Sequence, residues 1–423
     1  MISRITYLEL LKKREWDGNI KVITGIRRCG KSVLLFDIFK NYLLSKGIKE
    51  NNIIEVKLDR IEDIQLRNPF FLYDKISKII NDSEELFYLF IDEVQMAETI
   101  KDKKSGITAT VYDILNSFKD NKRLDVYVTG SNSKMLSKDI ATEFRGRSSQ
   151  IHIHPLSFKE YYDYVGGDEQ KALNEYMIIG GMPGIIHEET EIDKKEYLKN
   201  LYEEIYIKDI VEKNKIKRMD ILNDILDYLA GQISSLTNVT KVANAISTLK
   251  KEKVTHEMTS NYIDYSKDSF LISMARRYDI KGKAYFDYPN KYYYEDTGLR
   301  NARLNFRQID SGHLMENILY NELIRRGYSV DVGAVAVRNK NSLNYVEIDF
   351  IVNKLDYKVY IQSAFQISGE EKLKMEIRPL TLTDDFFKKV VVRNDILQSY
   401  YDENGIFHCK LTDFLLERVN LIN

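Results

Sequence analysis

The sequence IKVITGIRRCGKS, residues 20–32, places an apolar run directly before Gly25, Gly30, Lys31 and Ser32. This is the spacing G-x-x-x-x-G-K-[ST], set between a strand-like and a helix-like segment. The glycines let the loop turn tightly, so that successive backbone N–H groups point at one anionic group. The helix N-terminus adds partial positive charge, while the lysine and the hydroxyl can reach phosphate and Mg²⁺. The stretch therefore predicts a strand, a phosphate-binding loop and a helix that together hold a nucleoside triphosphate.

A second apolar run, Leu86–Ile91, ends in two carboxylates, Asp92 and Glu93. A continuous apolar run is typical of a parallel strand that is buried on both faces. In open α/β sheets, ligands bind at the carboxyl ends of the strands. We therefore expect Asp92 to hold Mg²⁺ through a water and Glu93 to act as the general base on the attacking water.

The run Val126–Asn132 repeats this scheme, because small polar residues follow an apolar strand. Ser131 or Asn132 is expected to orient the water and sense the γ-phosphate, and the sequence does not decide between them. Further along, Arg145 and Arg147 flank a glycine between a helical segment and a strand. This placement indicates an arginine finger, acting within the chain or on a neighbouring subunit. Exposed arginines in a turn are the alternative.

These patterns together predict an ATP site with Mg²⁺ on a doubly wound parallel sheet, because apolar runs near residues 20, 53, 86, 125 and 150 alternate with helical segments. A glutamate beside the aspartate favours AAA-like proteins over kinases. The residues expected to contact nucleotide are Gly25, Arg28, Cys29, Gly30, Lys31, Ser32, Val33, Asp92 and Ser131. The expected metal ligands are Ser32 and Asp92, and the expected catalytic residues are Glu93, Arg145 and Arg147.

Composition limits the remaining possibilities. A chain of 423 residues is long for one hydrophobic core, so two or three domains are expected. Two cysteines, Cys29 and Cys409, are too few for a disulfide framework or a cysteine zinc site. No apolar run is long enough to span a bilayer, and a net charge of −1 gives no global attraction to nucleic acid. We expect a cytoplasmic protein without membrane contact.

Residues 219–296 have the pattern of a winged helix, with three helical segments followed by two β-rich runs. In such a module the third helix enters the major groove, and here it would offer Thr259, Ser260 and Asn261. Acidic residues dilute the basic patch, so a winged helix used for packing or protein contact is the alternative to one that binds duplex DNA. The cations expected near phosphates are Lys250, Lys251, Lys253, Arg276, Arg277, Lys281 and Lys283.

The C-terminal part shows a third pattern, in which a helix carries Glu316 and an alternating hairpin carries Asp349. A helix glutamate, a strand aspartate and an acid-x-lysine pair are what metal-dependent endonucleases of the PD-(D/E)xK type assemble. Here Gln362 and Ala364 stand where the second acid and the lysine would be. Nuclease activity is therefore not expected, and Lys358 is the nearest candidate for a relocated lysine.

Seven segments in this order resemble the prokaryotic AAA-type ATPases that carry a C-terminal restriction-endonuclease-like domain of unknown function. They are GIRRCGKS, LFIDEVQ, VTGSNS, EFRGRSSQIHIHPLSFKEY, GGMPG, ENILYNELIRRGY and EIDFIV. The resemblance covers nearly the whole chain. It implies an AAA core with the phosphate loop, Asp92, Glu93 and Arg145 or Arg147, then a winged helix and a nuclease-like tail. Members of the family commonly lack the nuclease lysine, as this chain does.

The expected organisation is an AAA-type ATPase domain over residues 1–165, a helical lid with a winged helix over 166–300, and a restriction-endonuclease-like domain over 301–423. The leading hypothesis is an ATP-driven switch associated with duplex DNA. The second is a signalling ATPase whose output is binding of a protein partner or a further copy of itself. The third is an ATP-dependent nuclease that uses Glu316, Glu347 and Asp349.

Overall fold

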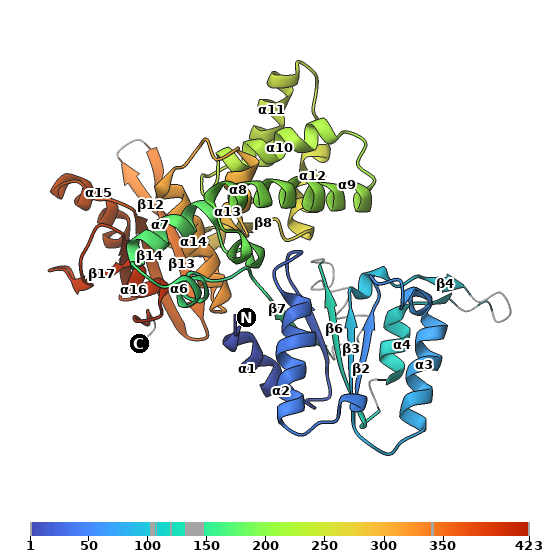
Figure 1. Cartoon of the computed structure of the whole chain (residues 1–423). Coiled ribbons are helices and arrows are strands. Elements are labelled where there is room, and N and C mark those ends of the chain that lie inside the picture. The colour runs from blue at the N-terminus through green and yellow to red at the C-terminus, as the bar shows by residue number, and fades with distance from the viewer. Residues whose placement is uncertain are drawn as a thin grey trace. The chain divides into compact units, whose positions relative to one another are not determined.

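The computed structural model describes residues 2–101, 106, 108–118, 121–131, 148–339 and 342–421 (Figure 1). The chain divides into two compact units. Unit 1 comprises Met1–His154 with Asp268–Phe270, and unit 2 comprises Pro155–Lys267 with Leu271–Asn423. The expected domain boundaries near residues 165 and 300 stay predictions. No helix in the described ranges is both long and apolar enough to cross a membrane.

Unit 1 is built on a five-stranded parallel sheet with the order β2-β3-β6-β1-β7, which confirms the predicted doubly wound sheet. Its strands are β1 (Ile20–Thr24), β2 (Ile53–Lys57), β3 (Phe87–Asp92), β6 (Leu124–Gly130) and β7 (Ser148–His152). Every residue of β1, β3 and β6 is buried, which explains their continuous apolar runs. The order places β6 between β1 and β3, and this position could not be read from the sequence.

Helices cover both faces of this sheet, and alternation along β3 decides which residues meet them. Leu89 and Ile91 pack in one core with α3 and α4, whereas Phe90 meets the aromatic rings of the helix that follows the phosphate loop. The helices are α1 (Ile5–Lys13), the continuous pair η1 (Val33–Phe39) and α2 (Lys40–Ser45), α3 (Pro69–Asn81) and α4 (Val111–Phe118). Strands β4 (Ile100–Lys101) and β5 (Thr108–Ala109) form a short antiparallel pair. Asp92 lies on the same face of β3 as Phe90, and this face is turned toward the start of η1.

The first half of unit 2 is helical. Its helices are α6 (Phe158–Val165), α7 (Glu169–Ile179), α8 (Glu191–Asn200), η7 (Leu201–Ile207), α9 (Lys208–Asn214), α10 (Met219–Gly231), α11 (Val239–Lys250), α12 (His256–Asp268) and α13 (Thr297–Arg303). The strands β8 (Ile272–Ala275) and β11 (Lys291–Tyr294) form an antiparallel pair. Helices α10, α11 and α12 and this strand pair lie where the sequence predicts three helices and two β-rich runs.

The second half of unit 2 is a mixed eight-stranded sheet with the order β10-β9-β12-β13-β14-β15-β17-β16. Its strands are β9 (Arg277–Asp279), β10 (Ala284–Tyr285), β12 (Ser329–Asn339), β13 (Ser342–Lys354), β14 (Tyr357–Ala364), β15 (Lys388–Arg393), β16 (Tyr400–Tyr401) and β17 (Phe407–Lys410). Its helices are α14 (Ser311–Arg325), α15 (Glu370–Thr381) and α16 (Leu411–Leu415). The antiparallel β13–β14 hairpin confirms the predicted alternating pair.

A bulge in β13 orients one of the predicted acids. Asp331 pairs with Ile351 and Gly333 with Ile348, so β13 has one residue more than β12 at this point. Ile348 and Ile351 both pack into the core that includes residues of α15. The ring of Phe350, in contrast, lies 6.5 Å from Tyr320 of α14. The bulge therefore lets Asp349 and Phe350 both face α14.

Candidate functional site

The phosphate loop joins β1 to η1, and its lysine folds back over the loop itself. The Lys31 ammonium donates hydrogen bonds to the carbonyls of Gly25 and Ile26, each at 3.1 Å, and is buried. Gly25 has a φ of +150°, and a Cβ there would lie 2.2 Å from the Ile153 carbonyl oxygen. Only glycine fits this position, because the backbone of Ile153, just after the end of β7, lies directly against the loop. The acceptors of the Lys31 ammonium are therefore neutral carbonyls. A phosphate would bind the ammonium more strongly than they do, because it carries negative charge.

Asp92 and Ser32 come together as the sequence predicts. The Asp92 carboxyl accepts hydrogen bonds from the hydroxyls of Thr129 and Ser32. Burial raises the pKa of Asp92, and the neighbouring Glu93 carboxylate raises it further. A buried carboxylate beside a hydroxyl offers the hard oxygen ligands that Mg²⁺ prefers. Among the residues that the structure describes, Asp92 makes no ion pair, so a divalent cation would relieve its electrostatic cost.

Glu93 is held in a defined position just beyond the end of β3. Its backbone is in the left-handed region, with a φ of 50°, and its N–H donates to the Thr129 hydroxyl at 3.1 Å. The Glu93 carboxylate accepts from the Gln95 side-chain amide and, at 3.3 Å, from the Ser131 hydroxyl. A strained non-glycine residue fixed by several partners is typical of functional sites.

The position of β6 brings Thr129 and Ser131 between the loop strand and the acidic strand. Of the two residues that the sequence leaves open, Ser131 contacts Glu93, whereas Asn132 lies outside the described residues, as do Arg145 and Arg147. The sequence does not single out Thr129 or Gln95. In the sequence, these two residues could have been found only from their positions. Thr129 precedes the polar end of β6, and Gln95 lies two residues after Glu93.

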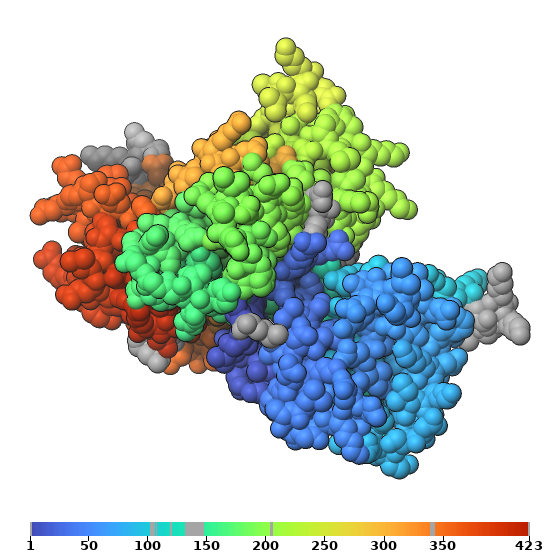
Figure 2. Space-filling view, in the orientation of Figure 1, coloured from blue at the N-terminus to red at the C-terminus, as the bar shows by residue number. Residues whose placement is uncertain are grey.

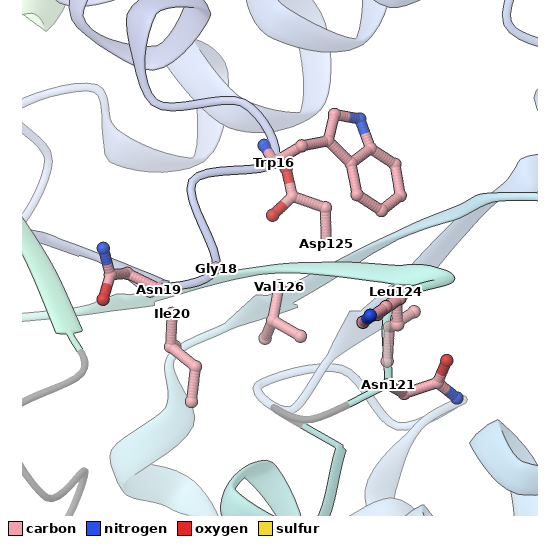
Figure 3. A pocket seen from close by; sticks show the side chains of 9 residues that line it. Trp16, Gly18, Asn19, Ile20, Asn121, Leu124, Asp125 and Val126 are labelled. Atoms are coloured by element: carbon pink, nitrogen blue, oxygen red, sulfur yellow. Dashed lines mark hydrogen bonds between the residues drawn. The ribbon is translucent and has the colours of Figure 1, made fainter.

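A pocket of about 240 Å³ lies at the opposite, amino-terminal edge of the same sheet, beside Trp16 and the start of β6 (Figure 3). Asp125 lines it and accepts hydrogen bonds from the Trp16 backbone N–H at 3.0 Å, from the Tyr127 hydroxyl at 2.8 Å and from the Lys21 ammonium. The Asp125 carboxylate is thus paired and hydrogen-bonded within the chain. This edge is best explained as packing of the segment before β1.

A second carboxylate cluster lies in unit 2, around Lys291 of β11. The Lys291 ammonium lies 2.8 Å from Glu316, 2.7 Å from Glu347 and 3.2 Å from Asp349. The Tyr293 hydroxyl donates to Glu316 at 2.8 Å. Burial raises the pKa of Glu316 and of Glu347, and the neighbouring Asp349 carboxylate raises both further, whereas the Lys291 ammonium opposes the shift.

The lysine in this cluster is not the one that the sequence suggests. Lys358 lies with its ammonium 4.7 Å from the centre of the Phe387 ring. Lys291 was missed because it precedes all three acids in a different predicted module. Gln362 is beside Asp349, accepting from its backbone N–H at 3.4 Å, and Ala364 is buried in the core with α15. The three acids that the sequence singles out do converge.

Two family models match this chain. A model described as an AAA domain matches residues 17–162, and one described as "Domain of unknown function (DUF8612)" matches residues 170–310. The first match and the parallel sheet with its phosphate loop define unit 1 as an AAA-type P-loop ATPase domain. The second description names no function, so the winged-helix and endonuclease-like interpretations remain proposals.

Two relatives align over most of their length. An uncharacterized protein of Haemophilus influenzae is 32% identical over 425 residues, covering 99% of each chain. An uncharacterized protein of Methanocaldococcus jannaschii is 27% identical over 407 residues, covering 89% of this chain and 85% of its own. The present chain belongs to the same family as the Haemophilus protein.

Among solved structures, AMPPCP-bound DnaA from Aquifex aeolicus aligns with a TM-score of 0.32 at 15% identity, covering 63% of this chain and 88% of that one. A TM-score this low does not establish a common architecture, so the assignment of unit 1 depends on the family model and on its own geometry.

Proposed function

We propose that this chain binds ATP with Mg²⁺ in unit 1 and hydrolyses it as a nucleotide-driven switch. The observation that supports this proposal most strongly is the strand order. Strand β6 brings Thr129 and Ser131 between the phosphate loop and the two acids, Asp92 and Glu93. Lys31 then binds the terminal phosphates, and Ser32 and Asp92 hold the cation. Bound Mg²⁺ would offset charge on the phosphate oxygens.

Within this proposal Glu93 accepts a proton from the attacking water, and Ser131 senses the γ-phosphate. The support for Glu93 is its fixed position beside Ser131, where the carboxylate is oriented by hydrogen bonds and is not paired with a cation among the described residues. Arg145 or Arg147 acts as the arginine finger, and this role depends on the sequence pattern alone.

The test separates nucleotide binding from turnover. Lys31→Ala is expected to abolish binding of a fluorescent ATP analogue, because it removes the cation that meets the phosphates. Glu93→Gln is expected to retain binding and to lower turnover by about 10²–10⁴-fold. Lys49→Ala and Glu98→Gln, at exposed positions of unit 1, are the matched controls. Undiminished hydrolysis by Glu93→Gln would remove Glu93 as the base.

We also propose that α10, α11, α12 and the β8–β11 pair form a winged helix that contacts duplex DNA. The favouring observation is an open groove of about 770 Å³ at the turn between α11 and α12, where Lys251, Lys253 and His256 are exposed. The end of α11 projects from the surface of unit 2 (Figure 2). Cations on a projecting turn can approach the phosphates of a duplex.

One of the expected DNA contacts, Thr259, is not available in this form, and two of the expected arginines lie over aromatic rings. The Thr259 side chain is buried and donates to the Thr255 carbonyl at 3.0 Å, because it lies on the inner face of α12. The guanidinium of Arg276 lies 4.2 Å from the ring centre of Tyr285. The guanidinium of Arg277 lies 4.8 Å from the ring centre of Phe286. Strands β9 and β10, which lie between β8 and β11 in sequence, join the large sheet through β12. The remaining candidates are the lysines of the turn, the outer face of α12, and Lys281 and Lys283, which are exposed.

Binding of a labelled duplex at two salt concentrations tests this part. Binding that weakens steeply with salt, and that Lys251→Glu with Lys253→Glu abolishes, would support DNA contact. Lys194→Glu, outside the groove, is the control for a general loss of positive charge. ATP hydrolysis is measured in the same samples with and without duplex. An unchanged rate and no salt-sensitive binding would favour the alternative, a switch whose output is protein binding.

We further propose that residues 301–423 have a restriction-endonuclease-like arrangement. Helix α14 carries Glu316 and precedes the antiparallel strands β12, β13 and β14, and Asp349 of β13 lies beside Gln362 of β14. The arrangement matches a nuclease scaffold in the placement of two acids. Catalysis of strand cleavage is not part of this proposal.

A further inference from the structure

The Lys291 ammonium contacts a carboxylate from each of three sequence positions. It lies 2.8 Å from Glu316 on α14, and 2.7 Å and 3.2 Å from Glu347 and Asp349 on β13. An ammonium has three N–H donors, which matches the number of carboxylates around it. The lysine side chain is 3% exposed. The cation is therefore central to the cluster and is not a surface ion pair.

The backbone around Lys291 fixes where the ammonium can go. Lys291 pairs with Ala275 across the β8–β11 ladder. The side chain of Asn317 on α14 donates to the Tyr294 carbonyl at 2.7 Å and accepts from the Tyr294 N–H at 2.8 Å. The rings of Tyr293 and Tyr320 are stacked with centres 4.1 Å apart. Strand β11 is held on α14 by these contacts, so Lys291 cannot leave the acids without unpacking that interface.

A metal-dependent nuclease needs different features at this point. Its carboxylates bind divalent cations that keep open positions for water and for the scissile phosphate. Here the space between the three carboxylates is filled by the ammonium, the second acid is the neutral Gln362, and the lysine position is Ala364. The residues present therefore do not fit a resident divalent cation.

We propose that the Lys291 ammonium occupies the place of a divalent cation among Glu316, Glu347 and Asp349, so that this cluster joins β11 to the C-terminal sheet and removal of the ammonium opens a divalent-cation site. The proposal depends on the endonuclease-like arrangement proposed above and is independent of the ATPase assignment. It also explains why unit 2 does not divide near residue 300: the cluster ties the strand pair of the middle segment to the sheet that follows.

Mn²⁺ is the probe, used with the full chain in an Asp92→Asn background and without nucleotide, so that unit 1 contributes little metal binding. With Lys291 present, water-proton relaxation should show no bound Mn²⁺, and Mn²⁺ should leave the melting temperature unchanged. Lys291→Ala should lower the melting temperature of unit 2 by about 10 °C, because the buried Glu316 and Asp349 and the partly exposed Glu347 lose their cation. Mn²⁺ should then bind at one site per chain and restore most of that loss.

The single tryptophan, Trp16, lies in unit 1, so its fluorescence follows unit 1 while far-UV circular dichroism follows both units. A shift in the dichroism transition without a shift in Trp16 fluorescence locates the effect in unit 2. Lys194→Ala, which removes a partly exposed lysine paired with Glu175, is the matched control. The proposal would be overturned if the protein that retains Lys291 bound Mn²⁺ and if Asp349→Asn abolished that binding. That comparison remains decisive if Lys291→Ala does not fold. A folded Lys291→Ala protein that binds no Mn²⁺ would also overturn it.

Discussion

The Asp92–Glu93 pair of unit 1 and the Lys291 cluster of unit 2 differ in the source of their positive charge. In unit 1, Asp92 and Glu93 are held by hydroxyl and amide groups, and within the described residues neither makes an ion pair. In unit 2, three carboxylates surround Lys291. Buried acids without a cation are electrostatically costly, and they suit a site that receives its cation with a ligand. In the roles proposed above, the same residue type binds a cation together with its ligand in unit 1 and joins elements of the fold in unit 2.

The largest effect that tests this difference is on stability. Asp349→Ala should lower the free energy of unfolding of unit 2 by about 3 kcal/mol, because a buried charged network loses one member and the Ser363 N–H loses its acceptor. Asp92→Asn should leave unit 1 equally stable or more stable by about 1 kcal/mol, since it removes an unpaired buried charge. Urea unfolding followed by Trp16 fluorescence and by far-UV circular dichroism measures both. Equal losses in the two variants would contradict the comparison.

A third kind of buried carboxylate makes the comparison sharper. Asp296 accepts from the backbone N–H groups of Gly181 at 2.6 Å and Leu299 at 3.0 Å, and burial raises its pKa from 3.8 to about 6. Because the folded state binds this proton more tightly, the stability from protonation is complete below pH 3.8 and is lost as the pH rises through about 6. The shift of about two units corresponds to about 3 kcal/mol at most.

Asp296→Asn has no proton to lose, so its stability relative to the unmutated chain should improve as the pH rises from 4 to 7. Unfolding free energies of the two proteins at several pH values in this window give the difference directly. Comparing the difference curve removes the contribution of every other titrating group. A flat difference would mean that folding does not raise the pKa of Asp296.

The smallest expected effect is at Gln95, which donates to the proposed base. Gln95→Ala should slow ATP hydrolysis, because the Glu93 carboxylate loses a hydrogen-bond donor that holds it in position. Turnover near neutral pH should change by less than about tenfold, and nucleotide affinity should not change. Gln65→Ala, at an exposed position of unit 1, is the control. Turnover by Gln95→Ala equal to that of the unmutated chain would show that Gln95 does not position Glu93.

Much of unit 1 could be predicted because its signals are local. The apolar runs and the residues at their carboxyl ends specify five strands, and parallel strands bring those ends to one edge. Thr129 and Gln95 escaped notice because hydroxyl and amide residues next to a motif carry no pattern of their own. Their role follows from the position of β6, which is set by pairing between segments far apart in the chain.

Lys291 shows more clearly which residues a sequence motif cannot predict. The three acids could be selected because they fit a known spacing, but their cation comes from β11, which has no sequence relation to that spacing. The prediction therefore favoured Lys358, which is close to the hairpin in sequence and lies over the Phe387 ring. The bulge at Asp349 was also not predictable, because it arises from the register between β12 and β13.

The insertion of β6 between β1 and β3 has a consequence for synthesis on the ribosome. The phosphate loop emerges early, yet its strand partner spans Leu124–Gly130, roughly a hundred residues later. At about 5–20 residues per second, the loop waits for about 5–20 s before that neighbour exists. A nascent chain stalled before β6 would carry a complete G-x-x-x-x-G-K-S sequence and no nucleotide site.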